Sequence, residues 1–261
     1  MSNLPEFQTL VCKKEQAILT VELNRPDKLN AFNEMMFGDV ARIAEIASSD
    51  SEVRIVVFKG RGRAFSSGAD LTELSGGITE IDDNTLEQHI RAAQQVMDQV
   101  EAISQPTIAA IHGPAVGAGF QLALACDFRI AVKGIKVGLS DVKIGILPAL
   151  GATTRLPKLI GLAKSKELIM SGNLITSEDA YQMGLLTELV EAEMLDESVY
   201  NLAKNISRSA PLALSAAKQL LNSEAPLDHA AAEQVKLFKS GDAHEGIAAF
   251  LEKRKPVFKG S

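Results

Sequence analysis

The chain has 261 residues, of which 46% are hydrophobic and 23% charged, and its formal net charge is −6. This length suffices for one large α/β domain or two small ones, and the composition is that of a globular protein. The mild acidity excludes a general nucleic-acid-binding protein, which needs a basic surface, and no apolar run approaches the ~20 residues that cross a bilayer.

Strands and helices are predicted to alternate through the first half of the chain. Period-two and short apolar runs predict strands, and helical spacing of apolar residues predicts helices. The strands fall at 7–24 (a hairpin turning at 13–16), 55–58, 107–111 and 128–132, and the helices at 33–48, 84–104 and 120–126. Asn33 is expected to cap the first helix, and the polar segment 72–84 is expected to be mobile. This order is typical of a mainly parallel sheet with right-handed crossovers.

After about residue 150 the pattern becomes mostly helical. Helices are predicted over 151–172, 192–208, 211–222 and 227–252, with one strand near 186–190. We therefore expect an α/β core over residues 1–195 and a C-terminal helical region over residues 196–261.

A glycine-rich turn follows the predicted strand 107–111 and runs from Gly113 to Gly119 into a helix. A helix N-terminus offers unpaired N–H groups and a favourable dipole, so this turn suits a negatively charged ligand atom. A dinucleotide site is disfavoured because Leu122 stands where the third glycine belongs. A P-loop is disfavoured because no Gly-Lys-Ser/Thr follows, while a purely structural turn stays open.

A second turn, Arg63–Leu71, follows the strand at 55–58. Ser66 and Ser67 lie within it, but the Gly-x-Ser-x-Gly pattern of a serine nucleophile is absent. The turn alone is also compatible with an ordinary strand-to-helix connection. His112 precedes the other turn, and we expect a structural role for it.

Asp141 is an acid among apolar residues in the segment 138–156. If it is buried, desolvation raises its pKa and suits it to proton transfer. A surface or helix-capping aspartate is the alternative.

The cysteines and histidines give no sign of a metal site. Cys12 and Cys126 lie far apart in apolar runs, and the histidines have no ligand spacing. We expect buried, reduced thiols, no metal and, because the N-terminus does not resemble a signal peptide, a cytoplasmic location.

Five motifs occur in a characteristic order. They are Leu23-Asn24-Arg25-Pro26 with Asn30-Ala31, then Ser67-Gly68-Ala69-Asp70-Leu71, Gly113–Gly119, Gly145-Ile146-Leu147-Pro148 and the ending Ala249–Phe258. Together they resemble the crotonase superfamily, the enoyl-CoA hydratase/isomerase family, over nearly the whole chain. The resemblance implies a crotonase-like spiral core of ββα units with a helical C-terminal trimerisation region, and a homotrimer or dimer of trimers.

The resemblance also implies a site for an acyl-CoA thioester. The N–H groups of Ala69 and Ala118 would hold the thioester oxygen as it becomes an enolate. Coenzyme A, which is part of the substrate and not a separate cofactor, would lie along Arg25, Lys28, Ala31, Gly68, Asp70 and Leu71. Phe250 and Lys253 would complete the CoA pocket of a neighbouring subunit.

This chain departs from the hydratases of the family at the acid/base positions. The positions of their two glutamates match Gln121 and Asp141, and Ala149 stands where some members place a further polar group. Gln121 cannot exchange a proton at neutral pH, although it can orient a water. Double-bond hydration and Δ3-Δ2 isomerisation, both with Asp141 as acid/base, are supported about equally by these residues. Hydrolysis, decarboxylation and a catalytically silent CoA-binding homologue are the alternatives.

Overall fold

The computed structural model of the chain describes residues 4–77, 81–223 and 225–261. Its main sheet has the strand order β1-β2-β3-β4-β6-β9. These strands are β1 (Leu10–Glu15), β2 (Ile18–Leu23), β3 (Ile55–Gly60), β4 (Thr107–Ile111), β6 (Phe128–Val132) and β9 (Glu188–Val190). The β1–β2 hairpin is antiparallel and the other pairs are parallel, which confirms the predicted mainly parallel sheet.

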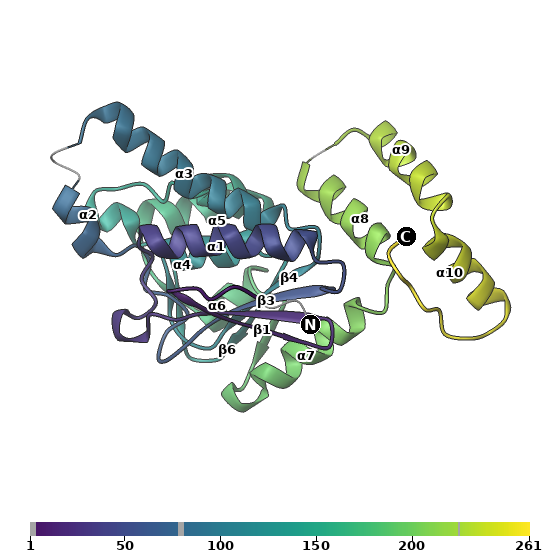
Figure 1. Cartoon of the computed structure of the whole chain (residues 1–261). Helices are drawn as coiled ribbons and strands as arrows, with labels where there is room; N and C mark the ends of the chain where they lie inside the picture. The colour runs from purple at the N-terminus through teal and green to yellow at the C-terminus, as the bar shows by residue number, and fades with distance from the viewer. Residues whose placement is uncertain (1–3, 78–80, 224) are drawn as a thin grey trace.

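Helices cover both faces of this sheet. Figure 1 shows α1 (Glu34–Ser49), α3 (Asp83–Glu101) and α5 (Ala152–Ser171) above it and α7 (Leu195–Ile206) below it. In β3, Val56 and Phe58 belong to the larger core cluster, whereas Ile55 and Val57 belong to the smaller one that includes α7 residues. Because successive side chains point to opposite faces, a strand buried on both faces has the continuous apolar sequence seen here.

A second, smaller sheet has the strand order β5-β7-β8. Its members, β5 (Ala115–Val116), β7 (Lys136–Gly138) and β8 (Ile175–Thr176), were not predicted. Strands of two or three residues are too short to show a period-two pattern. β5 lies between β4 and α4 (Ala118–Ala125), so this sheet holds the glycine-rich turn in place.

The C-terminal helices extend away from the core. Figure 1 shows α8 (Pro211–Ser223), α9 (Leu227–Phe238) and α10 (Gly241–Leu251) on one side of the molecule, and we call them the C-terminal arm. None of the described residues of α9 is buried. Large apolar side chains are exposed along the arm, among them Leu221, Leu227, Phe238, Phe250 and Leu251.

Some predicted boundaries were wrong. The hairpin turns after Glu15, with Gln16 at φ 53°, and not at 13–16. The segment 72–84, expected to be mobile, begins with α2 (Leu71–Gly77), while residues 78–80 lie outside the described residues. The predicted helix 227–252 is two helices, because the side chain of Ser240 accepts a hydrogen bond from Ala243 N and caps α10.

Among the described residues, four smaller elements, one short helix and three 3-10 turns, complete the order. The predicted helix 192–208 begins as a 3-10 turn, η3 (Ala192–Met194), before α7, and α5 is interrupted at Gly161, where φ is 74°. The short helix α6 (Ser177–Gln182) was not predicted. The 3-10 turns η1 (Pro26–Lys28) and η2 (Asp141–Ile144) carry candidate site residues.

Candidate active site

The peptide of Ala69 is held by a parallel bridge to Phe32. Phe32 N donates to Gly68 O (2.7 Å), and Asp70 N donates to Phe32 O (2.8 Å). In a parallel bridge the two residues flanking the bridged one make the bonds, so the N–H of Ala69 points to the opposite side. This strand-like segment therefore presents an N–H away from its partner.

The N–H of Ala118 begins α4, where a helix leaves its first donors unpaired. A Cβ built on Gly68 would lie 3.7 Å from Ala118 N and 3.6 Å from the Cα of Gly117. The two loops are thus in close contact, and glycine permits the approach. Among the described residues, neither Ala69 N nor Ala118 N donates a backbone hydrogen bond. Gly68 thus brings the loop that carries Ala69 close to the start of α4.

Asp141 lies close to Gly117, at the start of η2. Both of its carboxylate oxygens are 3.7 Å from the position of a Cβ on Gly117. Its Oδ2 is buried and has no hydrogen-bond partner among the described residues. Burial raises the pKa of the Asp141 carboxyl above its ordinary value, an effect that its own backbone N–H only partly offsets. A carboxylate beside unpaired N–H groups can exchange a proton with a bound ligand.

Gln121 lies on α4, three residues after Ala118, and is 1% exposed. Its Oε1 accepts a hydrogen bond from Ala152 N, the first residue of α5, at 3.3 Å. The neighbouring Ala149 offers no side-chain polar group, and its backbone oxygen accepts from Gln94 Nε2 at 2.8 Å. Of Gln121, Ala149 and Asp141, Asp141 is the residue with an ionisable side chain.

Most of the residues expected to contact CoA surround the Ala69 peptide. Arg25 Nη2 pairs with Asp70 Oδ2 at 3.0 Å, and its Nη1 donates to Ala31 O at 2.5 Å. Burial raises the pKa of Asp70, but hydrogen bonds from Arg25 and the backbone outweigh it and lower the pKa overall. Lys28 is exposed at the end of η1, and Leu71 is half exposed at the start of α2.

Phe250 and Lys253 lie apart from this group. Phe250 is 83% exposed in α10, and Lys253 follows the end of that helix. Figure 1 shows α10 at the opposite end of the molecule from α2. The chain's own fold does not bring them to the Ala69–Ala118 pair.

The serines and His112 are occupied by structural bonds. Ser66 is buried and its Oγ donates to Asn30 O at 2.8 Å. The Ser67 hydroxyl bonds weakly to Lys28 O (3.5 Å), and His112 Nε2 lies 3.0 Å from Gly62 O. These contacts agree with the structural role expected for His112.

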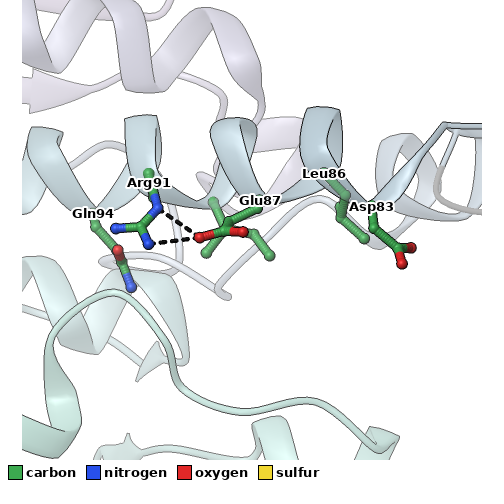
Figure 2. A pocket seen from close by; sticks show the side chains of 6 residues that line it. Asp83, Leu86, Glu87, Arg91 and Gln94 are labelled. Atoms are coloured by element: carbon green, nitrogen blue, oxygen red, sulfur yellow. Dashed lines mark hydrogen bonds and ion pairs between the residues drawn. The ribbon is translucent and has the colours of Figure 1, made fainter.

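Two cavities lie away from Ala69, Ala118 and Asp141. One, of about 420 Å³, runs along a face of α3, where Figure 2 shows Arg91 and Glu87 pointing toward one another beside Gln94. The other, of about 630 Å³, lies between the core and α8 and is lined by Cys126, Arg155 and Lys218, among others. Neither is lined by Ala69, Ala118 or Asp141.

The described residues contain no group of three or more His, Cys, Asp or Glu side chains placed to bind a metal ion. Cys12 is partly buried and Cys126 fully buried, and burial raises the pKa of each thiol to about 12. In the part of the chain that the structure describes, no helix combines the length and apolarity needed to span a membrane.

Comparisons with known proteins identify the family. The enoyl-CoA hydratase/isomerase family model matches residues 13–261. The 2,3-dehydroadipyl-CoA hydratase of Escherichia coli is 36% identical over 96% of this chain and 98% of its own, and the enoyl-CoA isomerase/hydratase fer4 of Mycosarcoma maydis is 34% identical over 91% of each. The crystal structure of an enoyl-CoA hydratase from Bacillus anthracis matches 97% of this chain and 100% of its own with a TM-score of 0.91 at 31% identity. These matches confirm the crotonase-like α/β fold and the expected enzyme class. The chain belongs to the enoyl-CoA hydratase/isomerase family.

Proposed function

We propose that this enzyme transfers a proton at the α-carbon of an acyl-CoA thioester, with Asp141 as acid and base. The observation that carries the proposal is the half-buried Asp141 carboxylate, which has an unpartnered oxygen and lies against Gly117, beside the free N–H of Ala118. A desolvated carboxylate is a stronger base than one in water, and its raised pKa brings it closer to the working pH.

The N–H groups of Ala69 and Ala118 would hold the thioester oxygen. Removing the α-proton places negative charge on that oxygen, and donors fixed in advance stabilise the charge without reorganising. Such a donor contributes roughly 3–4 kcal/mol in other enzymes. The Phe32 bridge and the start of α4 fix these donors before substrate arrives.

Double-bond isomerisation fits this arrangement better than hydration. A single carboxylate can remove the C2 proton of a 3-enoyl thioester and return it to C4, so one acid/base suffices. Hydration adds the hydroxyl group of a water to C3 and a proton to C2, and here Gln121 carries a carboxamide that does not titrate. Hydration remains a second candidate, favoured by the hydratase names of the relatives. Hydrolysis, decarboxylation and a silent CoA-binding homologue are the further alternatives.

We assign the CoA moiety to Arg25, Lys28, Ala31, Gly68, Asp70 and Leu71, with no separate cofactor. Lys28 is exposed and suits a phosphate as a flexible point charge. The exposed apolar side chains of the C-terminal arm support a homotrimer or a dimer of trimers, in which Phe250 and Lys253 reach a neighbouring subunit's CoA pocket. We also propose a cytoplasmic location.

Incubation with crotonyl-CoA and, separately, with a 3-enoyl-CoA tests the proposal. Hydration removes the absorbance of the conjugated enoyl thioester, whereas isomerisation creates it. We expect the absorbance to rise with the 3-enoyl substrate. No change with either thioester, despite tight CoA binding, would leave the silent homologue as the better description.

A further inference from the structure

The orientation of the Gln121 carboxamide is fixed by the start of α5. Its Oε1 accepts from Ala152 N, which is one of the otherwise unpaired donors of that helix. Because an amide nitrogen cannot accept a hydrogen bond, this contact also determines which end of the carboxamide is oxygen. The Nε2 donates no hydrogen bond to any described residue. The carboxamide oxygen of Gln121 therefore accepts a hydrogen bond, while its N–H groups donate none to the described residues.

The segment 149–152 that supplies this contact is held from α3. Gln94 Nε2 donates to Ala149 O at 2.8 Å. Arg155 Nη1 donates to Leu150 O at 3.1 Å, and its Nη2 bonds to Asp98 Oδ1 at 2.5 Å and to Glu101 Oε2 at 2.9 Å. The backbone just before Ala152 is thereby linked to α3 at two successive peptide oxygens, directly at Ala149 O and through Arg155 at Leu150 O.

The Arg155 side chain is more deeply buried than that of an ordinary ion-pairing arginine. Its side chain is only 7% exposed, and its Nε is buried without a partner. It also packs against Gly151, whose φ is 104°, and a Cβ at that glycine would collide with Nη1. Burying the Arg155 guanidinium and leaving its Nε unpaired costs free energy. The packing of the 149–152 segment therefore holds this side chain in place at a cost in protein stability.

We propose that Arg155 is a positioning residue, which through the 149–152 segment fixes Gln121 as a hydrogen-bond donor in the acyl-CoA site. This inference rests on the proposed function. It assigns Gln121 the role of a fixed donor toward the bound thioester or a water, and not the base that its place in the family suggests. Gln94 supports the same segment from α3.

A double-mutant cycle between Arg155→Met and Gln121→Ala tests the proposal. If Arg155 acts through Gln121, each single change lowers kcat by about 10- to 100-fold, and the double variant is no slower than Gln121→Ala alone. The KM for the acyl-CoA stays near the wild-type value. Effects that multiply in the double variant would overturn the proposal, because they would show that Arg155 contributes independently of Gln121.

Arg91→Met is the matched control. Arg91 also pairs with a glutamate of α3, Glu87, but both side chains are exposed and neither bonds to the 149–152 segment. We expect an unchanged kcat, and an equal loss in this variant would also overturn the proposal. If Arg155→Met does not fold, Gln94→Ala replaces it in the cycle, since it removes only the bond to Ala149 O.

The cycle separates this inference from the proposed function. Asp141→Asn is measured beside it on the same thioester. If Asp141→Asn is inactive and the effects of the Arg155 and Gln121 changes on kcat multiply, the inference is overturned and the proposed function stands. An Asp141→Asn variant with full activity overturns the proposed function and, with it, the inference.

Discussion

Gly68→Ala tests whether the Ala69 N–H serves as an oxyanion donor. Gly68 has φ 105°, a conformation that costs a non-glycine residue on the order of 1–3 kcal/mol. The added Cβ would lie 3.1 Å from Val116 O, which is closer than an ordinary contact. The backbone must shift to relieve both problems, and the peptide that carries the Ala69 N–H shifts with it. Loss of one such donor corresponds to roughly 3–4 kcal/mol, or about a 100- to 1,000-fold lower kcat.

Gly134→Ala is the matched control for this change. Gly134 also has positive φ, 75°, but a Cβ there meets no atom within 4 Å. Both variants should lose stability in thermal unfolding, whereas only Gly68→Ala should lose kcat in the enoyl-thioester absorbance assay. If the kcat of folded Gly68→Ala stays within about threefold of wild type, a difference below ~1 kcal/mol, the assignment of Ala69 is refuted.

Three further predictions concern Asp141, Gln121 and Lys218. The raised pKa of Asp141 means that activity should fall with acid through an apparent pKa above the ordinary value of 3.8, and a pH–rate profile with no inflection above that value would contradict it. Gln121→Glu should introduce a second titratable group and raise the ratio of hydration to isomerisation, measured by product analysis with both thioesters; an unchanged ratio would show that this position does not select the reaction. Lys218→Met should lower the free energy of unfolding by about 3 kcal/mol without changing kcat, because the buried Lys218 Nζ pairs with Asp127 at 2.7 Å. Denaturant unfolding that shows no loss would contradict this.

The sheet was predictable because its strands are buried on both faces. The apolar run at 55–58 indicated β3 directly, and the glycine turn after β4 indicated a helix N-terminus with free donors. Helix α2 was not predicted because it has Gly76-Gly77 at its end and few apolar residues to mark a buried face. The break at Ser240 was missed because apolar residues continue on both sides of it.

Some residues around the site were likewise indicated by the sequence, and others were not. Ala69, Ala118, Gln121 and Asp141 were proposed from local motifs, and in the structure Gly68 lies close to Ala118 and Gly117 lies close to Asp141. Arg155 and Gln94 were missed, since an arginine and a glutamine in predicted helices give no sign of their partners. Their role depends on contacts between α3 and residues 149–155, more than fifty positions apart in the sequence, which no local pattern encodes.

The central claim, that Asp141 carries the proton, is tested most directly by comparing Asp141→Asn with wild type on the thioester that wild type converts. Turnover should fall by at least ~100-fold. Stability at neutral pH should not fall, because the change removes a desolvated charge. This advantage should shrink as the pH drops through the raised pKa of Asp141 and vanish well below 3.8, where the aspartate is protonated in both the folded and the unfolded chain. Full turnover in the folded variant would contradict the account.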